Sequence, residues 1–131
     1  GLLPNAHEKA SYLRYLFFAA GPVEQAITAR SMGWDVGDDP QKQGTTGFGS
    51  YDRMVDALDT MLTGRDYVCG DRFTMADVYA GSQAIWGGEF GTLPKRDVFV
   101  SYAERLKSRD AYTAAKKIDA DLIAEREAAN A

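Results

Sequence analysis

The stretch "GDRFTMADVY", residues 70–79, predicts where the central helix of this chain begins. Thr74 occupies the N-cap position, where its side-chain oxygen can accept a hydrogen bond from the amide of Asp77. The Asp77 carboxylate, three residues later, can reach back to the Thr74 amide and complete a capping box. Phe73 and Val78 flank the pair at the spacing of a hydrophobic staple. We therefore expect a helix to start directly after Thr74.

The residues that follow this cap predict a buried helix. The run "VYAGSQAIWGG", residues 78–88, is small and apolar on nearly every side, and a helix without a polar face belongs in the interior. Burial would remove water from the first amides of the helix, so the structural cap made by Thr74 and Asp77 becomes more important. Loss of such a cap usually costs about 1 kcal/mol.

Helical periodicity also dominates the second half of the chain, and strand alternation is nearly absent. Between residues 51 and 62 the apolar positions follow the i, i+3, i+4, i+7 pattern of an amphipathic helix: Tyr51, Met54, Val55, Leu58, Met61 and Leu62. Two later helices are marked by Phe99, Tyr102 and Leu106 and by Ala111, Ala115, Ile118 and Leu122. The fold class is therefore predicted as all-α, a bundle of about five to six helices.

The first predicted helix, "HEKASYLRYLFFAA", residues 7–20, is unusually apolar. Its core stripe is predicted to consist of Leu13, Leu16, Phe17 and Ala20. The neighbouring tyrosines and Phe18 widen the apolar arc, so the helix should contact other groups on more than one side. Gly21 and Pro22 are predicted to break it, and "VEQAITAR", residues 23–30, restarts a turn or two.

Length and composition indicate one ordinary globular domain over residues 1–131, with 45% hydrophobic residues and a net charge of −4. No basic face predicts binding to nucleic acid. No apolar run approaches the roughly 18 residues of a membrane span, and residues 1–9 lack the apolar core of a signal peptide. A single cysteine, Cys69, excludes an internal disulfide and favours a cytoplasmic location.

Residues 31–50 are rich in Gly, Asp, Ser and Thr and are predicted as a solvated connection. The aspartates Asp35, Asp38 and Asp39 raise the question of a calcium loop. Pro40 stands where such a loop needs a flexible glycine, and no glutamate follows at the closing position. We therefore expect no metal site in this segment or elsewhere in the chain.

The order of these features resembles one known family. Residues 67–115 resemble the second half of the helical C-terminal domain of bacterial cytosolic glutathione S-transferases, whose central helix opens with a G-x-x-[FL]-[ST]-x-A-D run, here Gly70, Phe73, Thr74, Ala76 and Asp77. The upstream "YLRYLFFAAGPVEQA" resembles the first long helix of that domain, and residues 1–6 resemble the end of the interdomain linker. A later family pattern, R-P-A-Y, lacks its proline here, where Asp110 follows Arg109.

The resemblance implies a larger parent protein. In this family a preceding thioredoxin-like domain binds the co-substrate glutathione and supplies the Tyr, Ser or Cys that stabilises its thiolate. Residues 1–131 contain none of that domain, so no catalytic residue is assigned here. Cys69 is interpreted as a core residue and His7 as a solvated helix-end residue. The expected partners are the thioredoxin-like domain, a second copy in a homodimer and a small hydrophobic electrophile.

The resemblance also implies which side chains contact the electrophile. Aromatic residues of the first and central helices face the cleft between domains in this family, which points to Tyr12, Tyr15, Phe18, Trp86 and Phe90. Each could instead belong to the bundle core or a dimer contact. Arg14 is a weaker candidate for holding a glutathione carboxylate or an ion pair at the dimer interface, and a solvated arginine is its alternative reading.

Two functions remain open at this point. In the first, the chain is the electrophile-pocket and dimerisation domain of a transferase that conjugates glutathione thiolate to a hydrophobic electrophile. In the second, it is a non-catalytic helical protein-interaction module of the same fold, with no enzymatic activity. Such modules tend to lose the cleft aromatics, and this chain retains them, which favours the first reading.

Overall fold

A computed structural model describes residues 1–34 and 36–130, and its regular elements are all helices. None of these residues forms a β-strand; Tyr67 and Gly70 make one isolated bridge. The predicted all-α fold is confirmed. In chain order the elements are η1 (Ala6–Glu8), α1 (Lys9–Phe18), η2 (Ala19–Val23), α2 (Glu24–Ser31), α3 (Pro40–Thr45), α4 (Tyr51–Leu62), α5 (Met75–Phe90), α6 (Asp97–Lys107) and α7 (Asp110–Ala129).

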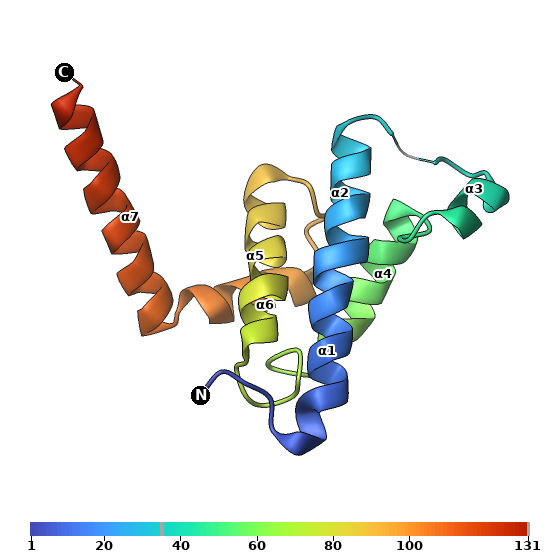
Figure 1. The fold of residues 1–131 in the computed structure, drawn as a ribbon, viewed down its shortest axis with the longest axis horizontal. Coiled ribbons are helices and arrows are strands. Elements are labelled where there is room, and N and C mark those ends of the chain that lie inside the picture. Colours follow the sequence, from blue (N-terminus) through green and yellow to red (C-terminus); the bar gives the residue numbers. More distant parts are fainter. Residues whose placement is uncertain (35, 131) are drawn as a thin grey trace.

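The chain from Ala6 to Ser31 forms one continuous helical rod through the middle of the molecule (Figure 1). The predicted break at Gly21 and Pro22 is therefore wrong. Proline lacks an amide hydrogen, and its ring crowds the carbonyl four residues earlier in an α-helix. The wider π-helical turn η2 accommodates Pro22 without ending the rod.

The face that this rod presents to the core also differs from the prediction. Three members of the predicted stripe are exposed: Leu13 at 48%, Phe17 at 69%, and Ala20. The buried positions are instead Tyr12, Ala19, Val23 and Ala26. Because α1 is apolar nearly all round, its sequence contains several stripes of similar hydrophobicity, and packing against α5 decides which one is buried.

The predictions for the second half of the bundle hold more closely. All six predicted apolar residues of α4 are buried, as are Phe99, Tyr102 and Leu106 of α6. The helix α5 is buried on one side only. Ala76, Ala80 and Ala84 lie in the core, whereas Trp86 is 52% exposed and Phe90 76% exposed. The expectation that α5 is surrounded on all sides is wrong for this chain.

The start of α5 is held by the carboxylate of Asp77, which is fully buried. Its Oδ2 accepts hydrogen bonds from the Thr74 amide at 2.8 Å and from the Thr74 hydroxyl at 3.0 Å. Its Oδ1 accepts from the amide of Val68 at 2.8 Å and from the Tyr102 hydroxyl at 2.9 Å. Asp77 therefore joins the loop before α5, the first turn of α5 and the middle of α6.

The connection between α2 and α4 contains a short helix that the sequence reading did not predict. The Asp39 carboxylate accepts hydrogen bonds from the amides of Gln41 and Lys42, and Pro40 occupies the first helical position. This is the ordinary signature of a helix start. Asp39 thus serves as a cap, while Asp35, weighed above as a calcium ligand, lies outside the described residues.

The predicted last helix is present as α7, but it contributes no buried side chain. It leads away from the bundle after α6, so that its far end stands clear of the other helices (Figure 1). Its apolar residues Ile118, Leu122 and Ile123 are 57–60% exposed. The amphipathic pattern therefore identified a helix correctly without identifying a neighbour for it.

Replacing Asp77 tests the importance of the buried carboxylate. We expect Asp77→Asn to lower the free energy of unfolding by about 3 kcal/mol or more, because one carboxylate oxygen becomes an NH₂ donor facing donors. Asp97→Asn is the matched control, since Asp97 is an exposed acid in the first turn of α6, and its loss should cost about 0.3–1 kcal/mol. Urea unfolding measures both, and equal small losses would contradict the role given to Asp77.

Two adjacent glycines of α5 give a second test, of packing. A Cβ on Gly87 would lie 2.6 Å from both Cγ and Cδ1 of the buried Leu93, whereas a Cβ on Gly88 meets nothing within 4 Å. We expect Gly87→Ala to destabilise the chain by about 1–3 kcal/mol. Gly88→Ala should stabilise it by about 0.5–1 kcal/mol through helix propensity. Thermal unfolding distinguishes the two, and the same sign for both would refute this packing.

Candidate functional site

An apolar groove runs between the outer face of α5 and the start of α7, with a volume of about 370 Å³. We call it the α5–α7 groove. Its walls are largely hydrophobic, and the side chains that line it include Leu2, Phe73, Val78, Ile85, Trp86, Leu106, Ala111 and Tyr112. The exposed side of α5 thus forms a concave surface, which is the usual form of a small-molecule site.

Two basic side chains, Arg109 and Lys116, line the α7 side of this groove. The guanidinium carbon of Arg109 lies 3.3 Å from the ring centroid of Phe73, close enough for a cation–π contact. The ammonium nitrogen of Lys116 lies 5.9 Å from the ring centroid of Tyr112. The groove therefore combines an apolar wall on α5 with positive charge on α7.

A second, smaller groove of about 320 Å³ lies between α1 and α4, and we call it the α1–α4 groove. It is lined by Arg14, Tyr15, Phe17, Phe18, Pro22, Ala57 and Met61. The Tyr15 hydroxyl accepts a hydrogen bond from Nη1 of Arg65 at 3.2 Å. The guanidinium carbons of Arg14 and Arg65 lie 5.9 and 5.5 Å from the centroid of the Tyr15 ring.

The five aromatic residues predicted for the electrophile pocket do not meet in one place. Trp86 lines the α5–α7 groove, and Tyr15 and Phe18 line the α1–α4 groove with Arg14. Tyr12 is 8% exposed and belongs to the core. Phe90, at the last position of α5, is exposed and lines neither groove. Sequence position alone did not show which of these aromatic residues lie on the same face of the helical rod or of α5.

The segment before η1 is fastened to the start of α5 by Arg72, which sequence reasoning missed. Its guanidinium donates hydrogen bonds to the carbonyl oxygens of Gly1 and Leu3, each at 2.9 Å, and also binds the Glu8 carboxylate. The Met75 amide donates to the Leu2 carbonyl at 2.9 Å. Leu2, which lines the α5–α7 groove, is thereby held in place. The sequence around Arg72 contains no pattern that predicts its contact with the first residues of the chain.

The thiol and the imidazole of the chain occupy unremarkable positions. Cys69 is partly buried, and burial raises the pKa of its thiol, which opposes formation of the reactive thiolate. Its Sγ lies 3.7 Å from the Thr74 hydroxyl. His7 is exposed in η1. Neither lies among the side chains that line the two grooves, so neither can serve as a nucleophile or base there.

Metal-ligand clusters and membrane-spanning helices are not found in the part of the chain that the structure describes. Residues 1–34 and 36–130 hold no group of three or more His, Cys, Asp or Glu side chains placed to bind one metal ion. Across the same residues, every helix is too short or too polar to cross a membrane.

Comparison with known families gives this fold a name. Residues 24–86, which span α2 to most of α5, match the family model described as "Glutathione S-transferase, C-terminal domain". The chain contains a glutathione S-transferase C-terminal domain. A search of curated proteins found no match, and a search of solved structures found none either. The predicted family and its helical fold are thus confirmed, and the match supports a glutathione S-transferase-like role in general.

The ion pair between Arg72 and Glu8 predicts that the stability of this domain depends on pH. The hydrogen bond from Arg72 lowers the pKa of the Glu8 carboxyl below its ordinary 4.5. A carboxyl with a lowered folded-state pKa stabilises the fold above its unfolded pKa and loses that effect as the pH falls through the folded pKa.

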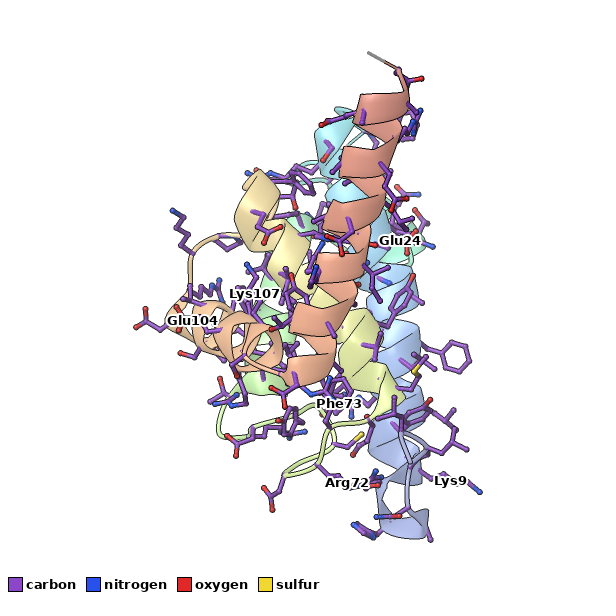
Figure 2. The ribbon with its side chains drawn as sticks, turned by 90° about the vertical axis from the view of Figure 1, so that its left-hand side faces the viewer. Lys9, Glu24, Arg72, Phe73, Glu104 and Lys107 are labelled. Carbon is purple, nitrogen blue, oxygen red and sulfur yellow. The ribbon has the colours of Figure 1, made fainter. Side chains whose placement is uncertain are left out.

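We therefore expect Glu8→Gln to be less stable than the natural chain at neutral pH, with the difference shrinking as the pH falls below about 4.5. Urea unfolding at a series of pH values measures it. Glu104→Gln is the control, because Glu104 is exposed on α6 and should show little difference at any pH (Figure 2). A Glu8→Gln difference that does not vary with pH would contradict the ion pair.

Proposed function

We propose that this domain supplies the electrophile-binding wall of a glutathione S-transferase whose preceding thioredoxin-like domain binds glutathione. The observation that carries the proposal is the α5–α7 groove, where exposed Trp86 and Val78 form an apolar wall beside the fastened Leu2. A domain joined ahead of Gly1 would lie at the mouth of this groove. Glutathione bound there would face an electrophile bound against α5.

The chemistry of the reaction assigns different roles to the two domains. Conjugation requires a thiolate, because the thiol is a poor nucleophile, and a group that lowers the thiol pKa must lie beside it. That group belongs to the preceding domain in this proposal. The residues of the α5–α7 groove bind the electrophile and orient its reactive carbon toward the sulfur, which converts a bimolecular encounter into a positioned reaction.

A second part of the proposal concerns dimerisation. Phe17 is 69% exposed and lines the α1–α4 groove, and Leu13 on the same helix is 48% exposed. Exposed apolar side chains beside a groove favour contact with another protein surface. We assign this face to a homodimer contact. The unpaired Cys69 fits a reducing cytoplasm as the location of the parent protein.

One observation favours the alternative of a non-catalytic interaction module. The apolar residues of α7, Ile118, Leu122 and Ile123, lie on a helix without any buried side chain, and such a face can receive a partner helix. The two functions are separated by catalysis. A module gives no conjugation when the preceding domain is restored, whereas a transferase does.

The test joins this chain to the thioredoxin-like domain encoded upstream and measures conjugation of glutathione with the neutral electrophile 1-chloro-2,4-dinitrobenzene. We expect turnover. We also expect Trp86→Ala to raise the KM for the electrophile about tenfold, because the electrophile loses its apolar contact with the indole ring. Trp34→Ala is the matched control, since Trp34 is 69% exposed and lines neither groove.

Absence of conjugation by the joined protein would contradict the transferase function. An unchanged KM in the Trp86→Ala variant, with turnover intact, would show that the electrophile binds elsewhere. Equal effects of the Trp86 and Trp34 substitutions would also contradict the assignment, because they would reflect a general loss of stability rather than a lost contact.

A further inference from the structure

We propose that the electrophile accepted by the α5–α7 groove carries an anionic group such as a carboxylate, which Arg109 and Lys116 hold while its apolar body lies against Trp86. The inference deepens the proposed function and rests on it. It follows from the charge on the groove lining, from the way Arg109 is held, and from the finding that neither basic side chain forms an ion pair within residues 1–34 and 36–130.

Arg109 is held in place without using its hydrogen-bonding edge on a carboxylate. Its guanidinium stacks on the ring of Phe73, which in turn meets the ring of Tyr67 edge-on at 5.8 Å. Phe73 lies beside the start of α7 (Figure 2). Stacking orients the guanidinium plane and leaves its N–H edge available, and that edge matches the two oxygens of a carboxylate.

Lys116 supplies a second charge on the same wall. Lys116 lies in the second turn of α7, and Arg109 directly precedes that helix as its N-cap residue. The Lys116 ammonium lies 5.9 Å from the ring of Tyr112, which stands between them along the helix. Lys116 and Arg109 both line the α5–α7 groove.

The acid that lines the groove and the acid at the far end of α5 are both engaged. Asp77 is the only acidic residue among those lining the groove, and four hydrogen bonds occupy its carboxylate. Glu89, at the other end of α5, pairs with Lys107 at 2.6 Å. Within residues 1–34 and 36–130, neither Arg109 nor Lys116 forms an ion pair, whereas neighbouring Lys117 pairs with Asp121 at 2.8 Å. The groove is therefore lined by two positive charges that are not held in an ion pair.

This arrangement selects a ligand with two different ends. An apolar body gains from the hydrophobic wall, and an anionic end gains a charge-assisted hydrogen bond that a neutral end of the same size lacks. The apolar wall on α5 reduces the screening of that interaction by water on one side. The preferred electrophile is therefore a hydrophobic organic acid.

The test uses the 131-residue chain and a matched pair of unreactive probes, 6-phenylhexanoate and 6-phenylhexanamide, in isothermal titration calorimetry. We expect the carboxylate to bind about fivefold more tightly than the amide, as for a partly exposed ion pair. Lys116→Gln should remove most of this preference for the carboxylate over the amide. Lys117→Gln, one residue away and paired with Asp121, should leave both affinities unchanged.

Equal affinities for the two probes would overturn the inference, as would equal effects of the Lys116 and Lys117 substitutions. The joined protein separates this result from failure of the proposed function. Conjugation of a neutral electrophile without any preference for a carboxylate analogue contradicts the inference and leaves the transferase function standing. A carboxylate preference in the chain, without conjugation by the joined protein, supports the anion site and contradicts the transferase function.

Discussion

The buried carboxylate of Asp77 is the constraint on which the rest of the domain depends. A charged group without access to water is tolerated only when its oxygens are hydrogen-bonded, and here four donors meet that requirement. They come from the loop at Val68, from Thr74 at the start of α5 and from Tyr102 in α6. Burial, together with the charge of Asp77, raises the pKa of Tyr102, so its hydroxyl stays protonated and remains a donor. One side chain therefore fixes the relative positions of three segments.

The α5–α7 groove inherits its shape from this arrangement. Fixing the start of α5 places the residue before the cap, Phe73, against the guanidinium of Arg109, and it turns Val78 and Trp86 outward along one wall. Fixing Tyr102 sets the position of α6, whose end leads directly into α7. The same carboxylate that satisfies the helix start thus determines where the apolar wall and the positive charges lie. Structural and binding roles are joined in one short stretch of sequence.

How much the sequence could predict depended on whether the deciding contact was local. The pairing of Thr74 with Asp77 spans three residues and could be read directly, and so could the buried face of α4. The bonds from Val68 and Tyr102 to Asp77 span 9 and 25 residues, and no local pattern signals them. The face of α1 could not be chosen because apolar residues surround that helix, and the π-helical turn at Pro22 depends on a backbone adjustment that composition does not encode. For the same reason the sequence could not show that Trp86 and Tyr15 line different grooves.

The most direct test of the central role of Asp77 is native-state hydrogen exchange at the two amides that it binds, those of Val68 and Thr74. Both lie outside regular helix hydrogen bonding, so local opening should expose them quickly unless the carboxylate holds them. We expect both amides to exchange only through global unfolding, as slowly as the amides in the middle of α5. Rapid exchange at Val68 and Thr74, with the middle of α5 still protected, would contradict this expectation.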